Sequence, residues 1–366
     1  MGTVGVSLTD APACGYDEVN VTVRKVRIHR SSAVPDTADG WADINLNPPR
    51  KINLLDLNNG ILESLGETPL SAGQYTQVRL VLVANSGGTP ANSVVLSSAP
   101  GVEVPVDTPS AVQSGIKLVH AFVVRGNERT DLVLDFDACK SIVKRGNGTY
   151  LLKPVIQVLP DALNGIQGFI DPALLASGVV VSAQQNGEII RSTVPGSPSG
   201  RFFLTRLNTG FYDLLITADG RATAMITSVP IANSSFIAVV STNVQPITLP
   251  ASVTHTVSGR VTLNPASTTD TVGFVAAKQT FGGATVTVKS VAAELFGGAY
   301  SLTLPAEAPL LGTYGTGAPI SLASVPGAAG LYAIEASADG YDGYTAQSVA
   351  KDLSSADATQ NFILIP

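Results

Sequence analysis

The sequence predicts an all-β protein made of three β-sandwich modules in tandem, of the immunoglobulin-like or transthyretin-like type, with at most one or two short helices in the first module. Three observations predict this fold class. Short runs of Val, Ile, Thr, Tyr and Phe alternate with polar residues along the chain, as half-buried strands do. Gly (35) and Pro (23) are frequent among the 366 residues, as expected where many turns join short strands. Three apolar runs also end in proline, which cannot continue a strand ladder.

The first module contains one change of strand pattern and one helical pattern. Runs typical of strands are Thr3–Leu8, Val19–Ile28, Gln74–Val83, Ile116–Arg125 and Tyr150–Val158. In the second run the apolar face changes parity after Val23, so a β-bulge is expected near Arg24–Lys25. The segment Asn58–Leu65 fits a helical period loosely, and Gly60 within it is unfavourable for a helix.

The three proline endings predict the module borders. They are Val158-Leu159-Pro160, Thr248-Leu249-Pro250 and Leu364-Ile365-Pro366. We therefore expect modules at residues 1–160, 161–250 and 251–366. The third module carries an insertion at 306–329, rich in Gly, Pro, Ala and Ser, which is typical of a surface loop.

The second and third modules repeat each other. Gly210-Phe-Tyr is followed after five residues by Ala-Asp-Gly220, and Gly330-Leu-Tyr is followed at the same spacing by Ala-Asp-Gly340. Such internal self-similarity indicates a repeated structural unit. Tyr212, Leu214 and Ile216 alternate onto one strand face, and the following Ala-Asp-Gly is expected to form a turn.

Composition limits the function classes. Only 14% of residues are charged, the net charge is −6, and there are 3 His, 2 Cys and 1 Trp. The net charge argues against binding of nucleic acid or of an anionic membrane by the chain as a whole. Most catalytic classes draw on His and Cys, so the scarcity of these residues argues against an enzyme and predicts no catalytic residues. Residues 161–366 hold 8 basic and 13 acidic residues, a low-charge surface typical of modules that space, support or adhere.

Both parts of the chain resemble known families. Val6-Ser-Leu-Thr-Asp-Ala-Pro12, Leu134-Asp-Phe-Asp-Ala138 and Leu70-Ser-Ala-Gly-Gln-Tyr75 resemble the bacterial domain of unknown function 4382 family. Gly330-Leu-Tyr with Ala338-Asp-Gly-Tyr341 resembles carboxypeptidase-regulatory-like domains, which are transthyretin-like sandwiches, and the second module is similar to them more weakly. The first resemblance implies an exported, often lipid-anchored, surface protein, and the second implies a non-catalytic accessory domain.

The start of the chain fits export in one of two interpretations. Met1 is followed at once by a strand-like run without a leader-like segment, which we interpret as a start placed before a processed chain. A native cytoplasmic start is the alternative. We expect location at the outer membrane, the cell surface or the extracellular space, with any lipid anchor lying upstream.

The two cysteines, Cys14 and Cys139, both lie in the first module. In an exported protein an even cysteine count indicates a disulfide, so we expect a Cys14–Cys139 bond. Two separate buried thiols are the alternative.

Carboxylates form the candidate metal site. Asp131, Asp135 and Asp137 share parity on one predicted strand, with Leu132, Leu134 and Phe136 on the other face. The expected disulfide would bring Asp10 near Asp137. Oxygen ligands without histidine suit Ca²⁺, so Asp10, Asp135 and Asp137 are the predicted metal ligands and Ca²⁺ the one cofactor considered. The alternative is that these carboxylates are solvated edge charges and turn formers.

Two functional hypotheses follow. The first is a non-enzymatic structural, adhesive or ligand-binding surface module, whose partners are a protein or glycan at the cell surface or further copies of itself. The second is a carboxylate- or cation-dependent enzyme or sensor with its site near Asp10 and Asp137.

Overall fold

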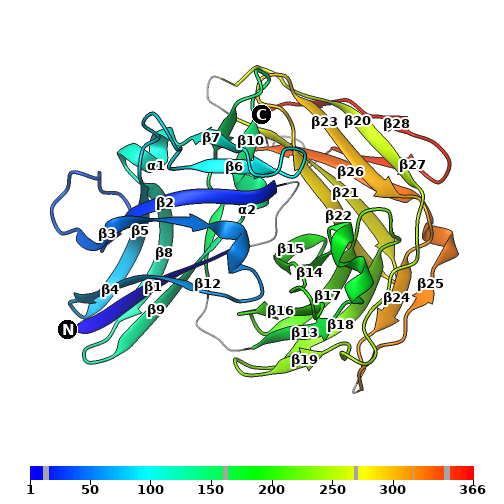
Figure 1. Cartoon of the computed structure of the whole chain (residues 1–366), viewed down its shortest axis with the longest axis horizontal. Helices are drawn as coiled ribbons and strands as arrows, with labels where there is room; N and C mark the ends of the chain where they lie inside the picture. Colours follow the sequence, from blue (N-terminus) through cyan, green and yellow to red (C-terminus); the bar gives the residue numbers. More distant parts are fainter. Residues whose placement is uncertain (11–15, 160–163, 268–270, 316, 342–346) are drawn as a thin grey trace. The chain divides into compact units, whose positions relative to one another are not determined.

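The chain folds into two compact, nearly all-β units. The computed structural model describes residues 1–10, 16–159, 164–267, 271–315, 317–341 and 347–366 (Figure 1). One unit comprises Met1–Ile142 and Thr149–Asp161, and the other comprises Val143–Gly148 and Ala162–Pro366. The all-β prediction is confirmed, because helical structure among the described residues is limited to short segments. No described helix is long and apolar enough to span a lipid bilayer.

The first unit contains a four-stranded sheet and an eight-stranded sheet. The order in the first sheet is β12 (Ile156–Leu159), β9 (Arg129–Phe136), β1 (Gly2–Asp10), β4 (Glu63–Leu70). The order in the second is β10 (Ile142–Lys144), β11 (Tyr150–Leu152), β7 (Glu103–Asp107), β6 (Ser93–Leu96), β2 (Tyr16–His29), β5 (Gly73–Leu82), β8 (Ile116–Val124), and β3 (Ala42–Asn53) pairs with β2. Of β10, Ile142 belongs to the first unit and the next two residues are assigned to the second. Four of the five strand runs predicted for this module each coincide with one strand, whereas Tyr150–Val158 is divided between β11 and β12, which belong to different sheets.

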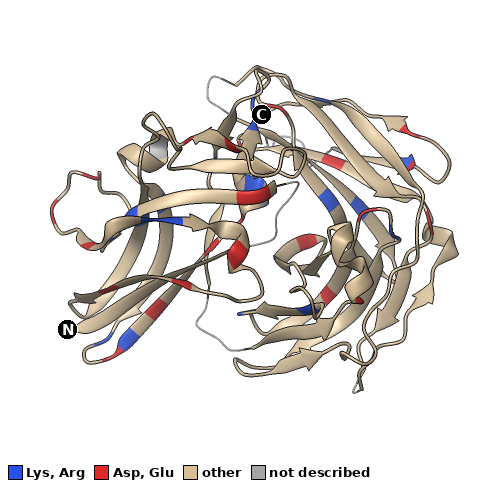
Figure 2. Ribbon diagram, in the orientation of Figure 1, with Lys and Arg blue, Asp and Glu red and all other residues tan. Residues whose placement is uncertain are grey.

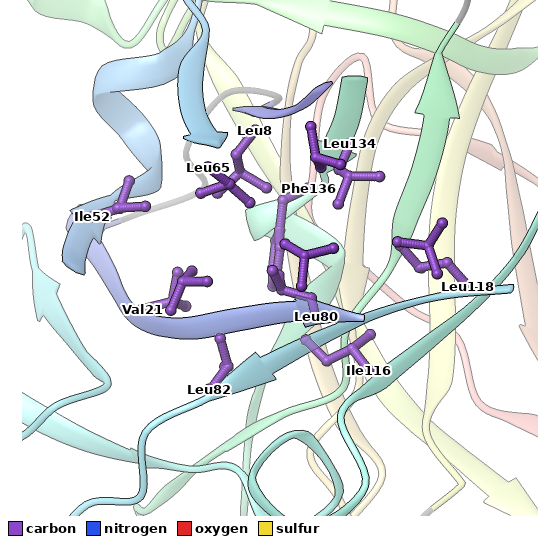
Figure 3. Close-up of a cluster of buried hydrophobic side chains, with 14 of the residues drawn as sticks. Leu8, Val21, Ile52, Leu65, Leu80, Leu82, Ile116, Leu118, Leu134 and Phe136 are labelled. Atoms are coloured by element: carbon purple, nitrogen blue, oxygen red, sulfur yellow. The ribbon is translucent and has the colours of Figure 1, made fainter. Parts of the chain in front are cut away.

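Both sheets contribute side chains to one apolar core (Figure 3). Leu8 and Phe136 come from the four-stranded sheet, and Val21 and Leu80 come from the eight-stranded sheet. The alternation predicted for β9 is confirmed, since Leu132, Leu134 and Phe136 all enter this core. Burying each of these side chains stabilises the fold by roughly 1.5–3 kcal/mol.

The predicted bulge in β2 is confirmed. Its pairing with both β3 and β5 shifts register between Val23 and Lys25. The extra residue returns Val26 and Ile28 to the face that Val19, Val21 and Val23 occupy, and these apolar side chains are fully or almost fully buried.

The predicted helix over Asn58–Leu65 is wrong. The helical segment nearby is the 3-10 helix η1 (Leu54–Leu57), and the chain then turns through Asn59 and Gly60, both with positive φ (56° and 78°). Left-handed residues end a right-handed helix, and Leu65 lies on strand β4 with its side chain in the core. The other short helices of this unit are α1 (Pro109–Gln113) and α2 (Ala138–Ser141).

The second unit contains two sandwiches with the same strand order, as the sequence repeat predicts. In the first copy, the strand order of one sheet is β16 (Arg201–Thr205), β13 (Gly165–Phe169), β19 (Ile237–Val239). In the second copy, the order of the corresponding strands is β23 (Ala299–Pro305), β20 (Thr254–Leu263), β28 (Ala358–Thr359). In the second copy β29 (Phe362–Leu364) also pairs with β20. The 3-10 helix η2 (Pro172–Ser177) follows β13.

The facing sheets repeat as well. Their orders are β15 (Glu188–Thr193), β14 (Val180–Gln185), β17 (Gly210–Thr217), β18 (Ala224–Ile231) and β22 (Ala284–Ala292), β21 (Gly273–Phe281), β26 (Leu331–Ala338), β27 (Gln347–Asp352). Tyr212 and Tyr332 are buried at equivalent places, and each hydroxyl donates a hydrogen bond to a backbone oxygen, that of Asn208 and of Pro305 respectively. The predicted alternation of Tyr212, Leu214 and Ile216 onto the core face is confirmed.

The insertion at 306–329 is not the surface loop that its composition predicts. It contains β24 (Leu310–Thr313), β25 (Ala323–Ser324) and the 3-10 helix η3 (Pro326–Ala328). Strand β24 runs parallel to β18, so the insertion of the third module extends the sheet of the second module to six strands (Figure 1). We call residues 306–325 the arm.

The arm also covers the core of the second module. Leu310, Tyr314, Ile320 and Leu322 pack against that core. Three backbone amides of the arm donate hydrogen bonds to it, from Leu310 to Thr223, from Tyr314 to Thr227 and from Ile320 to Val240. Composition alone missed this role because pairing of backbone groups does not depend on side-chain type.

A second contact, here called the seam, joins the outer faces of the two sandwiches. Leu215 and Met225 point away from their own core and pack with Phe281, Val286 and Ala328 of the third module. The β17 run Leu214-Leu215-Ile216 therefore has apolar side chains on both faces, which is typical of a strand buried on both sides. Charged side chains are sparse in this unit (Figure 2), as its low-charge sequence predicts.

A fully buried amide side chain, that of Gln184, contributes to the seam. Gln184 of β14 accepts a hydrogen bond from the Thr287 amide (2.7 Å) and donates to the Thr287 carbonyl (2.9 Å) and to the Ser182 hydroxyl (2.9 Å). A backbone amide and carbonyl of β22 thus find their partners on a side chain of the other sandwich.

We expect Gln184→Ala to destabilise the second unit by about 2–4 kcal/mol, because it leaves both buried backbone groups of Thr287 without a partner. Urea unfolding measures the change. Gln185→Ala is the matched control, since that side chain makes one exposed hydrogen bond, to the Phe211 carbonyl, and its loss should cost less than about 1 kcal/mol. Equal effects of the two substitutions would contradict this account of the seam.

Candidate functional site

The predicted acidic site lies where two parallel strands end. Strands β1 and β9 pair in register, with Thr9 opposite Asp135 and Asp10 opposite Phe136. The backbone of Asp10 is therefore one strand away from the end of β9. The side chain of Asp10 lies outside the described part of the chain, and so does the whole of Cys14.

Thr9 fixes the loop next to this strand end. Its hydroxyl lies 3.0 Å from the Leu57 carbonyl oxygen and 2.9 Å from the Ile61 carbonyl oxygen. Thr9 and Asp135 are both buried, and as register partners in a parallel pair they project from the same face of the sheet. Ile61 and Leu62 follow in this loop and are exposed.

Asp137 does not share the strand face with Asp135. Strand β9 ends at Phe136, and Asp137 is the N-cap of α2, where its carboxylate accepts a hydrogen bond from the Lys140 amide (3.0 Å). The Lys140 ammonium lies 3.3 Å from the other carboxylate oxygen. The prediction that Asp135 and Asp137 share one strand face is wrong, because the strand ends at Phe136, one residue earlier than the sequence pattern indicates.

Asp131, at the other end of β9, is also engaged in local contacts. Both of its carboxylate oxygens lie 2.9 Å from Nε of Arg129, and Arg129 also contacts Glu67. The described side chains contain no group of three or more His, Cys, Asp or Glu that could hold a metal ion. The Ca²⁺ set of Asp10, Asp135 and Asp137 therefore stays a prediction that depends on a side chain outside the described residues.

The Cys14–Cys139 disulfide also stays a prediction. Cys139 contributes its backbone to α2, directly after Ala138 in the core, but its side chain is not among those described. The bond requires Cα atoms within about 7 Å of each other.

A cluster of cations around the single tryptophan is the feature that sequence reasoning missed. The guanidinium carbons of Arg27 and Arg79 lie 4.7 and 4.8 Å from the Trp41 ring centroid, and the His29 ring centroid lies 5.0 Å from it. Arg79 also donates to the carbonyls of Ser114 and Val34, both at 2.9 Å. The sequence feature that could have predicted this cluster is the alternate spacing of Lys25, Arg27 and His29, which places them on one face of β2. These contacts attach the segment after β2 to the sheet.

Asp43 is the anion of this cluster. Partial burial by itself raises the pKa of Asp43, but hydrogen bonds from Lys25 (2.7 Å) and Arg27 (2.9 Å) outweigh it, and the pKa is lowered. A depressed carboxyl pKa stabilises the fold above the ordinary value of 3.8, and this contribution is lost as pH falls through the folded-state pKa.

We therefore expect Asp43→Asn to cost about 1 kcal/mol at neutral pH and close to nothing well below pH 3.8, because Asp43 is then protonated in both states. Urea unfolding at several pH values tests this. Glu128→Gln, which removes an exposed pair with Arg125, is the control and should stay within about 0.5 kcal/mol at each pH. A stability difference that does not depend on pH would contradict the assignment.

Comparison with known proteins adds a family match for the first unit. Residues 1–154 match the family model described as a domain of unknown function, DUF4382. No curated protein matches the chain.

Three solved structures are similar to the chain at a low level. The Bacillus anthracis TIE protein is 11% identical with a TM-score of 0.20, covering 100% of this chain and 50% of that one. The SpaC pilus adhesin from Lactobacillus rhamnosus GG is 9% identical with a TM-score of 0.21, covering 100% and 43%. The Corynebacterium diphtheriae major pilin SpaA is 10% identical with a TM-score of 0.20, covering 99% of each chain. This chain thus spans half the length of the first and less than half of the second, and likeness at these TM-scores carries no argument about function.

Proposed function

We propose that this protein is a non-enzymatic, exported bacterial surface protein with a structural or adhesive role. The observation that carries the proposal is the interlock of the last two sandwiches through the arm and the seam. Modules joined by a linker move relative to each other by default, whereas a large apolar interface suppresses that motion. An interlocked pair therefore suits a stiff spacer that carries load or presents another domain.

The sequence supports further parts of this proposal. The family matched by residues 1–154 is one whose members we expect to be exported and often lipid-anchored. The two sandwiches at 161–250 and 251–366 are proposed to be carboxypeptidase-regulatory-like domains. Their partners would be a surface protein, a glycan or further copies of the chain. The helix-cap role of Asp137 gives the alternative of a carboxylate-dependent enzyme no support.

Single-molecule pulling on the full chain tests the mechanical role. With handles at residues 164 and 366, we expect the two sandwiches to unfold in one event that releases about 700 Å of chain, at roughly 3.4 Å per residue. Two separate events of about half that length would contradict the interlock. Labelling of intact bacteria with a membrane-impermeant reagent tests the location, and retention of the protein in the cytoplasm would overturn the surface role.

A further inference from the structure

Side chains of the eight-stranded sheet hold one loop of the first unit in place. Residues 31–40, here called the strap, join β2 to β3 and contain no helix or strand. Arg27 of β2 donates a 2.8 Å hydrogen bond to the Asp36 carbonyl. Arg79 of β5 donates a 2.9 Å hydrogen bond to the Val34 carbonyl. An arginine side chain stays protonated in proteins, so these two contacts do not depend on pH.

His29, the last residue of β2, holds both ends of the strap. Its Nδ1 accepts a hydrogen bond from the Ser31 amide (2.9 Å), and its Nε2 lies 3.1 Å from the carbonyl oxygen of Asp39. A carbonyl oxygen can only accept, so Nε2 carries the proton and Nδ1 carries none. The two contacts together therefore require the neutral ring. The same ring lies against the half-buried Trp41, with 5.0 Å between the ring centroids.

A proton on Nδ1 would break the first of these contacts. Nδ1–H and the Ser31 amide are both donors, so they cannot share a hydrogen bond. The Ser31 carbonyl oxygen lies 3.2 Å from Nδ1, but the Gln77 amide, in the orientation that satisfies its own hydrogen bonds, already donates to that oxygen at 2.9 Å. Protonation therefore takes the ring away from the Ser31 amide, and the strap loses that attachment.

The charges around His29 make a further cation unfavourable. The charged residues on the elements around the ring are cations on or next to β2, β5 and β8 and anions of the strap and β3, namely Lys25, Arg27, Arg30, Arg79, Lys117, Asp36, Asp39 and Asp43. The guanidinium carbons of Arg27 and Arg79 lie 4.7 and 4.8 Å from the centroid of the Trp41 ring, which His29 also contacts. Asp43 already accepts a hydrogen bond from Arg27 at 2.9 Å. A protonated His29 would thus be a third cation at one indole.

We infer that the strap is an acid-released cover, which His29 holds over Trp41 when its ring is neutral and releases when the ring takes up a proton. Histidine is the side chain that ordinarily changes charge between about pH 5 and 8. Losing one hydrogen bond of about 1 kcal/mol corresponds to an open fraction about fivefold higher. Opening would expose the indole together with the guanidinium groups of Arg27 and Arg79. This device does not depend on the proposed surface role.

Hydrogen exchange of the Trp41 indole in the full chain tests the proposal. The chain has one tryptophan, and its Nε1 donates to the Pro35 carbonyl of the strap (3.2 Å), so exchange with water requires the strap to open. His29→Gln is the variant, since a glutamine amide can donate and accept as the neutral ring does but takes up no proton. We expect the ratio of the wild-type exchange rate to the His29→Gln rate, measured by NMR, to be about fivefold higher at about pH 5 than at about pH 8. Taking the ratio at each pH cancels the pH dependence of the exchange chemistry itself.

His120→Gln is the matched control, because it removes another histidine of the same unit, on β8, and leaves the strap contacts intact. It should show the same increase as the wild type. An unchanged ratio overturns the proposal, and so does an increase that His120→Gln abolishes. If circular dichroism shows that His29→Gln does not fold, the indole chemical shift of the wild type decides instead. One titration step between about pH 5 and 8 then supports the proposal, and the absence of such a step overturns it.

Discussion

Replacing the arm, residues 306–325, with a Gly–Ser linker of equal length is expected to unfold the second sandwich. The replacement removes β24 and β25 from the six-stranded sheet and uncovers the core beneath Leu310, Tyr314, Ile320 and Leu322. With Leu311 and Val325 of the seam, six partly buried apolar side chains are lost, at about 1 kcal/mol each. The sum of about 6 kcal/mol is comparable with the whole stability of many domains. Circular dichroism and urea unfolding measure the effect.

A control separates loss of the arm from a general effect of changing this segment. Added Cβ atoms at Gly315 and Gly317 would meet nothing within 4 Å, so a Gly315→Ala/Gly317→Ala variant should unfold as the wild type does. The account of the arm is wrong if the linker variant keeps a cooperative transition at an unchanged urea midpoint. That outcome would mean that the second module is complete without residues of the third.

Gly298→Ala is expected to be among the most destabilising single substitutions in the chain. Its Cβ would lie 2.1 Å from the Val261 carbonyl oxygen, and φ at this position is 67°. A backbone atom cannot move aside as a flexible side chain can, so β20 would have to shift away from this turn. We expect the free energy of unfolding to fall by at least about 4 kcal/mol, a large loss that is typical of substitutions that strain the backbone. Gly200→Ala should behave alike, since its Cβ would lie 2.0 Å from the Ile170 oxygen.

Gly340→Ala is the control that isolates the contact from the backbone conformation. Gly340 has φ of 75°, yet a Cβ there would meet nothing within 4 Å. The Gly340→Ala variant should therefore lose only about 1–2 kcal/mol of stability, the cost of placing a residue with a Cβ atom at positive φ. Urea unfolding of both variants gives the comparison, and equal losses at Gly298 and Gly340 would show that close backbone approach is not what requires the glycine.

Local pattern predicted those features of the fold that local physics controls. The bulge between Val23 and Lys25 follows from parity, because the apolar residues on both sides of it must reach the same core. The repeat of Tyr212 and Tyr332 follows from spacing, and both residues occupy equivalent strands. The helical pattern over Asn58–Leu65 misled because apolar spacing does not register the left-handed residues Asn59 and Gly60.

The sequence predicted the candidate site less well than it predicted the fold. Parity placed Asp135 and Asp137 on one face, but α2 begins directly after Asp137 and uses its carboxylate as a cap. The cluster around Trp41 joins Arg27 of β2 to Arg79 of β5, which are far apart in the chain and meet through register alone. No spacing rule within one segment could have paired them.

The sequence by itself determined the strand-rich fold class, the bulge in β2 and the repeated sandwich. Each of these depends on the periodicity of side chains within a short segment, and such periodicity is written in consecutive residues. The tertiary structure alone decided that the arm belongs to the sheet of the preceding module and that Leu215 and Met225 face a second sandwich. Backbone hydrogen bonds and apolar contacts accept any partner of suitable shape, so the choice among partners depends on which surfaces the folded chain brings together.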